Sequence, residues 1–357
     1  RYNLSRHFCF THDLPFNQTA GSCWQALGLS MSRNFILATL AFVFIVLVLV
    51  PMMIAWTGRV DLYFTLTSVA LLSIASAGVW LTFYIGRINI GQGAYSLLGG
   101  YVSAILVVEY GVSFWLTLPL AGLVCAAFAV LIGLPILRLR GVYFAMTSLV
   151  LTQVMSLIAL ALPITNGAKG MVSIPLPGAL SIFGLTIIPD FTTLTNLKQG
   201  FYYLSVILML VCYAALYRLT KSRLGALCVS LQQNEELASS IGVNITALRI
   251  LAYAISSFLG GIGGAIFVAI SQSIYPSSFT VADSVNFMLN CFLGGLGYVF
   301  GPMLGTLVLY FGWDLLYKTA EYQLLIFSII LIGLMLVLPN GLLSLRPTHL
   351  FGKSRHV

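Results

Sequence analysis

The side chains that most often carry out chemistry are scarce in this sequence. The histidines all lie near its two ends, at His7, His12, His349 and His356. Nucleophilic catalysis needs a nucleophile with a base beside it, and a metal ion needs a cluster of ligands. No CxxC pair occurs among the cysteines, which are Cys9, Cys23, Cys125, Cys212, Cys228 and Cys291. We therefore expect no catalytic residue and no metal site, and we interpret the cysteines within apolar runs as small apolar side chains.

A nucleotide-binding loop is also missing from the sequence. The phosphate-binding motif reads G-x-x-x-x-G-K-[ST] and follows a strand. Gly352, Lys353 and Ser354 reproduce its last three residues, but Pro347 stands where the first glycine is required. No strand is expected before it. We therefore expect that any use of ATP takes place on another chain.

The composition indicates which elements must position the remaining polar groups. Hydrophobic residues make up 59% of the 357 residues, charged residues make up 7%, and the mean hydropathy is +1.01. An average soluble domain carries about 25% charged residues, so the bilayer must be the solvent for most of this chain. The formal net charge of +8 comes from small groups of Lys and Arg between apolar runs. That pattern is typical of loops facing anionic lipid, so we expect no nucleic-acid partner.

Ten apolar runs are candidates for membrane spans. Only helices and closed barrels satisfy backbone groups in lipid, and no alternating ten-residue strands occur. We expect an all-α polytopic membrane protein with about 8–10 transmembrane helices, some of them half-helices, and only short strands, if any, in 163–201. The runs cover 35–56, 62–85, 93–109, 113–136, 142–162, 202–219, 248–271, 284–300, 302–317 and 322–339, of which 93–109, 284–300 and 302–317 are short or rich in glycine.

The basic residues predict the orientation of the chain. Cytoplasmic loops are enriched in Lys and Arg. With ten spans and the N-terminal side inside, most of the 17 basic residues fall inside, and the exceptions in the loops are Arg59, Lys169, Lys198 and Lys318. We expect both termini inside and loop 163–201 outside. Three segments follow: a polar tail 1–30 that need not be native because Met31 resembles a start, a transmembrane domain 31–345, and a cytoplasmic tail 346–357.

The internal loop 218–248 contains the clearest local signal. Asn234 can cap a helix, and the two glutamates after it lie in the first turn, where the helix dipole favours anions. Leu237 and Ile241 share a face, and Gly242 suits a left-handed helix end. We expect a short amphipathic helix that can lie in a groove of a partner protein. The alternative is an ordinary connecting loop that rests on lipid headgroups.

Longer motifs run through about residues 60–345. They are Gly91-Gln92-Gly93-Ala94-Tyr95, Leu137-Arg138-Leu139-Arg140-Gly141, Ser222-Arg223-Leu224-Gly225, Asn234-Glu235, Ser256-Ser257-Phe258-Leu259-Gly260-Gly261, Gly294-Gly295-Leu296-Gly297 and Pro339-Asn340-Gly341-Leu342-Leu343. In these motifs the chain resembles the branched-chain amino-acid permease family of bacterial ABC importers, in particular its LivM-type members.

The resemblance implies a permease subunit, not an enzyme, that moves branched-chain amino acids across the bacterial inner membrane. It implies four kinds of partner: a second, LivH-like permease, two ATP-binding subunits, an extracytoplasmic solute-binding protein, and membrane lipid. ATP and Mg²⁺ would bind the ATPase, and no cofactor would bind this chain. Some relatives in the family carry urea or short amides, so import of those solutes is the alternative. Within the loop, the resemblance assigns coupling to the ATPase to Arg223, Gly225, Asn234, Glu235, Ala238 and Gly242.

A second group of candidates lies within the apolar runs. The chain has 33 glycines, and small residues let helices pack closely in lipid. Glycines can also break helices, which is tolerated at membrane depth only beside protein or a water-filled cavity. We expect the Asn and Gln side chains among the candidates to lie inside the protein, either in interhelical hydrogen bonds or in contact with solute. The candidates for a translocation path are Asn89, Gly91, Gln92, Gly93, Asn286, Asn290, Gly294 and Gly295.

Ionisable residues are nearly absent from the centres of the expected spans. Asp283 and Asp314 lie near span ends. Carriers driven by protons or sodium commonly bury carboxylates, so the pattern favours an external energy source. A channel or secondary carrier is the alternative of a different class, but it would give no reason for the helix in loop 218–248.

Overall fold

The computed structural model describes residues 45–57, 60–139, 141–182, 185–188, 191, 196–240, 242–316, 322–337 and 341–344. The expected tails 1–30 and 346–357 and the first part of the expected span 35–56 lie outside these residues. The chain divides into two units, 1–58 and 59–357. In the first unit, a π-helix at Ile45–Leu49 continues into helix α3 at Val50–Thr57.

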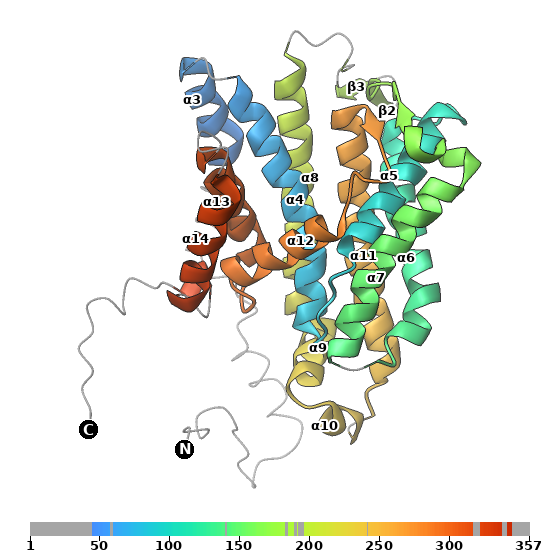
Figure 1. The fold of residues 1–357 in the computed structure, drawn as a ribbon, viewed down its shortest axis with the longest axis vertical. Coiled ribbons are helices and arrows are strands. Elements are labelled where there is room, and N and C mark those ends of the chain that lie inside the picture. The colour runs from blue at the N-terminus through green and yellow to red at the C-terminus, as the bar shows by residue number, and fades with distance from the viewer. Residues whose placement is uncertain are drawn as a thin grey trace, which may run out of the picture. The chain divides into compact units, whose positions relative to one another are not determined.

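The second unit is built around helix α11 (Ile245–Ser271), which packs against α4 (Asp61–Tyr84), α5 (Gln92–Val108) and α6 (Phe114–Ile136). Figure 1 shows α11 among these helices. Its glycines explain the close contacts. A Cβ at Gly264 would collide with the Ser96 carbonyl oxygen of α5, and a Cβ at Gly261 would lie 2.8 Å from the Cys125 sulfur of α6. Close helix packing, which we expected for most glycines, is confirmed for this group.

The described residues contain five helices that are long and apolar enough to cross a membrane. They are α4, α6, α7 (Val142–Ala161), α8 (Leu197–Lys221) and α11. The expected all-α polytopic class is confirmed, and the total of eight to ten spans stays a prediction.

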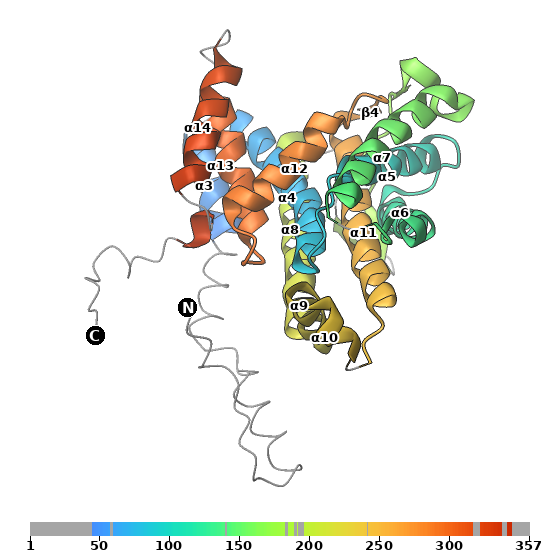
Figure 2. The same cartoon turned by 60° about the horizontal axis from the view of Figure 1, so that its bottom comes forward.

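Among the described residues of the second unit, four further apolar helices are shorter: α5, α12 (Val281–Gly294), α13 (Gly301–Leu315) and α14 (Gln323–Val337). The 14 residues of α12 extend about 21 Å, which is less than the hydrocarbon thickness of about 30 Å. Both views show α12 between α13 and the α5–α7 pair (Figure 1, Figure 2). The run 284–300, which we expected to be either a span or a half-helix, is helical only as far as Gly294, because Gly295 has a φ of 110° and the chain turns there.

Strands occur mainly in the long loop before α8. Strand β2 (Leu180–Ile182) pairs with β3 (Leu185–Ile188), and β1 (Met171–Val172) pairs antiparallel with β4 (Ser273–Ile274). The prediction of short strands in 163–201 is confirmed for β1 to β3. The prediction missed β4, which follows α11 and pairs with β1 so that Ile274 lies opposite Met171. A two-residue strand has no alternation that a sequence could show.

The expected inner and outer loops separate to the two ends of the second unit. At one end, the Lys198 ammonium lies 3.3 Å from the Asp61 carboxylate, and the Trp115 indole donates to the Gly178 carbonyl. At the other end, Arg87 Nη1 donates to the Leu139 carbonyl at 2.7 Å. Helices α9 (Arg223–Gln233) and α10 (Glu235–Ser240) lie at this second end, opposite β2 and β3 in Figure 1.

Candidate functional site

The loop between α8 and α11 is mostly helical. Helix α9, which we did not expect, follows α8 after a sharp corner at Ser222. Gly225 makes this corner possible, because a Cβ there would collide with the backbone of Thr220. Leu231 and Cys228 are buried on the inner face of α9, and burial raises the pKa of the Cys228 thiol to about 11, so the thiol stays protonated near neutral pH. The spacing of Leu224, Leu227, Cys228 and Leu231 was the signal for this helix.

Helix α10 has the ends that the sequence predicts. Asn234 Oδ1 accepts a hydrogen bond from the Glu236 amide at 3.0 Å, which satisfies one free N–H of the first turn. Gly242 follows the helix with a φ of 83°, in the left-handed region that favours glycine. Ala238 is 1% exposed and packs inward. The caps therefore hold a helix of only six residues in place.

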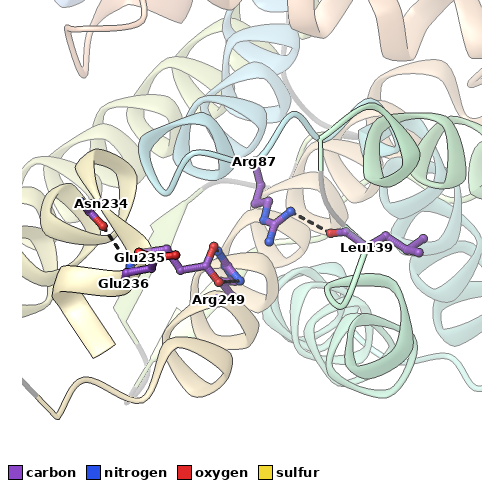
Figure 3. A network of polar contacts seen from close by, with 6 residues as sticks. All are labelled: Arg87, Leu139, Asn234, Glu235, Glu236 and Arg249. Carbon is purple, nitrogen blue, oxygen red and sulfur yellow. Dashed lines mark hydrogen bonds and ion pairs between the residues drawn. The ribbon is translucent and has the colours of Figure 1, made fainter. Parts of the chain in front are cut away.

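Glu235, which the resemblance assigns to coupling with the ATPase, makes a contact within the chain. Its carboxylate forms a bidentate ion pair with the Arg249 guanidinium of α11, with distances of 3.1 and 2.7 Å. Figure 3 shows the two side chains facing each other. The Arg249 side chain is 11% exposed and that of Glu235 is 32% exposed. Such two-point contacts combine charge with fixed geometry.

A second connection joins the loop to the end of α4. Gln232 Nε2 of α9 donates to the Phe83 carbonyl at 3.3 Å. Gly86, in the turn after α4, has a φ of 76° and lies against Gln232. Arg87 follows and also lies over the Phe144 ring at 6.0 Å. The loop therefore contacts both α11 and the segment that leads from α4 into α5.

Other side chains of the loop face outward. Arg223, Glu236, Ser239 and Ser240 are exposed. The apolar face that we expected from Leu237 and Ile241 lies outside the described side chains. Of the six predicted coupling residues, Arg223, Asn234 and Gly242 are exposed, Glu235 is partly buried, and Gly225 and Ala238 are buried.

The first translocation candidates form a buried polar contact between the start of α5 and the middle of α11, which we call a polar crossing. Gln92 is fully buried: its Nε2 donates to the Ser256 carbonyl of α11 at 3.0 Å, and its Oε1 accepts from Ser256 Oγ at 3.2 Å. Asn89 Oδ1 accepts from the Gly91 amide at 2.9 Å, and Asn89 Nδ2 has no hydrogen-bond partner among the described residues. Because Ser256 lies in the middle of α11, α5 begins within the helix bundle and not at its surface.

Neighbouring helices approach this crossing closely. The Gly93 amide donates to Ser284 Oγ of α12 at 3.0 Å, and Ser284 in turn lies 3.2 Å from the Thr152 hydroxyl of α7. A Cβ at Gly91 would collide with the Ser148 carbonyl of α7. The two glycines therefore permit backbone contact that any larger residue would block.

The second group of candidates lies where α12 meets α13. Asn290 Nδ2 donates to Ser76 Oγ of α4 at 2.9 Å, and Trp80 Nε1 of α4 donates to the Leu296 carbonyl at 2.9 Å. Gly294 touches the Gly301 backbone so closely that a Cβ would collide with it. The helix break at Gly295 is thus held against α4. We considered two roles for these amides, interhelical hydrogen bonding and contact with solute. Gln92 and Asn290 both form interhelical hydrogen bonds.

One candidate amide is placed differently from our prediction, and another was missed. Asn286 of α12 is exposed and not interior, although it shares a face of the helix with the buried Asn290 one turn later. Gln153 of α7 is also exposed. Of the exposed residues in the five long helices, Gln153 is the one polar side chain outside the first and last turns. A polar residue inside run 142–162 was the signal that would have identified it.

A bundle of long apolar helices with buried polar crossings, half-length helices and a helical loop at one end defines a multi-pass membrane protein. The chain belongs to the family described as branched-chain amino acid transport system / permease component, whose family model matches residues 62–338.

Individual relatives agree with this family. The chain is 30% identical to the high-affinity branched-chain amino acid transport system permease protein LivM of Salmonella typhimurium over 75% of this chain. It is 30% identical to LivM of Escherichia coli over 73% of this chain, and 26% identical to the E. coli permease protein LivH over 42% of this chain and 50% of LivH. The matches span 66% and 64% of the two LivM proteins, slightly less than two thirds of their length. No solved structure matches the chain.

Proposed function

We propose that this chain is a membrane-spanning permease subunit of an ABC importer for branched-chain amino acids. The match to the permease family over 62–338 carries the proposal, and the printed function of the two LivM relatives supports the choice of solute. Import of urea or short amides by the same architecture is the alternative, and no described contact favours it.

The energy source in this proposal is ATP hydrolysed with Mg²⁺ on two separate subunits. Helices α9 and α10 supply the contact, because they project from the end of the bundle between two spanning helices, α8 and α11 (Figure 2). Their exposed side chains, among them Arg223 and Glu236, would face the ATPase. A LivH-like permease and an extracytoplasmic solute-binding protein complete the proposed complex.

The proposed location is the bacterial inner membrane with both termini inside. The grouping of Arg87, Leu139 and Gln232 at one end of the bundle supports this orientation, because these residues belong to loops expected inside. Exposed Ser239 of α10 would then be cytoplasmic. Labelling of Ser239→Cys by a membrane-impermeant maleimide in intact cells would contradict the orientation.

Reconstitution tests the proposed function. The full complex in proteoliposomes should take up labelled leucine, isoleucine or valine only when ATP and the loaded solute-binding protein are both present. Labelled urea and acetamide, supplied in the same way, test the alternative solutes. Uptake that proceeds without ATP would favour the channel or carrier class and would end the importer proposal.

The translocation path is proposed along the outer face of α7 and α12. Gln153 lies about 16 Å along α7 from its first residue, near the middle of a span. An amide facing hydrocarbon without a hydrogen bond costs about 2–7 kcal/mol. The Thr152–Ser284 hydrogen bond holds α7 beside α12, whose exposed Asn286 is the second such amide. A polar lining of the solute path, shared with the second permease, supplies the partners that lipid lacks.

We expect Gln153→Leu to reduce ATP-dependent leucine uptake about tenfold, because one polar contact of about 1–1.5 kcal/mol is lost. The amount of assembled complex should stay unchanged. Val154→Leu, a change at the next exposed position of the same helix, is the matched control and should transport normally. If Gln153→Leu keeps the wild-type rate and KM, α7 faces lipid at this depth and the path lies elsewhere.

A further inference from the structure

Helix α10 depends on other parts of the chain for its orientation. Helices shorter than about 12 residues are marginal by themselves in water, and α10 has six residues. The Asn234 cap and the Gly242 turn act within the loop, whereas the Glu235–Arg249 pair attaches the helix to α11. This pair is the one salt bridge among the described residues with both side chains at least two-thirds buried.

Arg249 is well placed to pass on a displacement. It lies in the second turn of α11, and its Nε is buried without a hydrogen-bond partner among the described residues. The same helix holds Ser256, which binds Gln92, and Gly264, which touches the backbone of α5 at Ser96. Tightly packed helices move as units and not by continuous bending. A shift of α11 therefore reaches the polar crossing at the start of α5.

We propose that the Glu235–Arg249 ion pair is the rigid link that converts movement of α10 into movement of α11, with Arg249 as the positioning residue. This inference rests on the proposed function, because the movement comes from the ATPase. It also reassigns Glu235: the carboxylate serves contact within the chain, and the neighbouring Glu236, which is exposed, belongs to the surface that α10 offers to the ATPase.

The experiment uses the complete complex in proteoliposomes, four variants of the ion pair and one control variant. Glu235→Gln removes the charge at almost constant shape, and Glu235→Arg and Arg249→Glu reverse one charge each. The double variant Glu235→Arg/Arg249→Glu restores an opposite pair. Asp61→Arg is the matched control, since it reverses one charge of the exposed Lys198–Asp61 pair at the opposite end of the bundle. Three quantities are measured: the ATPase that co-purifies, ATP hydrolysis with loaded solute-binding protein, and leucine taken up per ATP hydrolysed.

We expect Glu235→Gln and both charge reversals to lower leucine uptake per ATP about tenfold while the ATPase still co-purifies and hydrolyses ATP. The double variant should recover to within about threefold of the wild type, as for a pair whose effects are coupled. Asp61→Arg should leave uptake per ATP and the amount of bound ATPase unchanged.

Two outcomes overturn the link. The first is wild-type uptake per ATP in Glu235→Gln, with or without a loss of folded protein, since the pair would then serve stability alone. The second is a double variant that recovers no better than the single reversals. A wild-type complex without ATP-dependent uptake would instead overturn the proposed function, and this inference with it.

Discussion

Gly264→Ala should prevent the native packing of α11 against α5. A Cβ at position 264 would collide with the Ser96 carbonyl oxygen and would lie 2.8 Å from the Gly100 nitrogen. Both neighbours are backbone atoms in the middle of α5, so no side chain can rotate away. Overpacking of a tight core typically costs about 1–3 kcal/mol, and we expect the upper end or more because whole helices must separate. Unfolding in mixed micelles, followed by tryptophan fluorescence, measures the loss.

Gly263→Ala is the matched control on the same helix. Its Cβ would lie 3.6 Å from the Ala75 Cβ, which is an ordinary contact. Alanine in place of glycine within a helix is favourable by about 0.5–1 kcal/mol. We expect Gly263→Ala to be at least as stable as the wild type. Equal stability of the two variants would show that α5 and α11 are not in the close contact described here.

Gly242→Val should uncouple transport from ATP while leaving the protein folded in the membrane. Gly242 has a φ of 83°, and no atom lies within 4 Å of a Cβ built on it. The cost is therefore backbone strain and not collision. A non-glycine residue in the left-handed region loses about 1–2 kcal/mol, and a β-branched one more. Since about 1.4 kcal/mol is a factor of ten, the population of correctly placed α10 should fall about tenfold or more.

The measurement for Gly242→Val is leucine uptake per ATP together with co-purification of the ATPase. Gly242→Asn is the control, because asparagine adopts the left-handed conformation at low cost. We expect near-normal uptake for asparagine and at least a tenfold loss for valine. If valine and asparagine behave alike, the conformation of residue 242 plays no part in coupling.

Local features of the loop could be predicted because their interactions join neighbours in the sequence. Asn234 caps α10 through an amide two residues away, and Gly242 ends it by its own backbone conformation. The apolar runs predicted the long helices for a similar reason, since in lipid each helix must satisfy its own backbone. Helix α9 was missed although its apolar spacing was visible, because the prediction for the loop was built on the capping residues of α10 alone.

The roles of the polar residues were decided by tertiary structure. Gln92 and Ser256 are 164 residues apart in the sequence. No local sequence feature specifies that the two side chains meet. Burial follows the face that a helix presents to its neighbours. Asn286 and Asn290 share a face of α12, but only Asn290 is covered, because it lies against Ser76 of α4. Gln153 lies on an uncovered face of α7.

The sequence by itself determined that this protein is a helical membrane protein, which of its segments form long apolar helices, and where the short helix of the loop begins and ends. These properties depend on composition and on contacts within a few residues. Only the tertiary structure decided that Glu235 binds Arg249 inside the chain, because the ion pair requires α10 to fold back against the start of α11. A carboxylate in a motif looks the same in sequence whether its partner is the next helix or another protein.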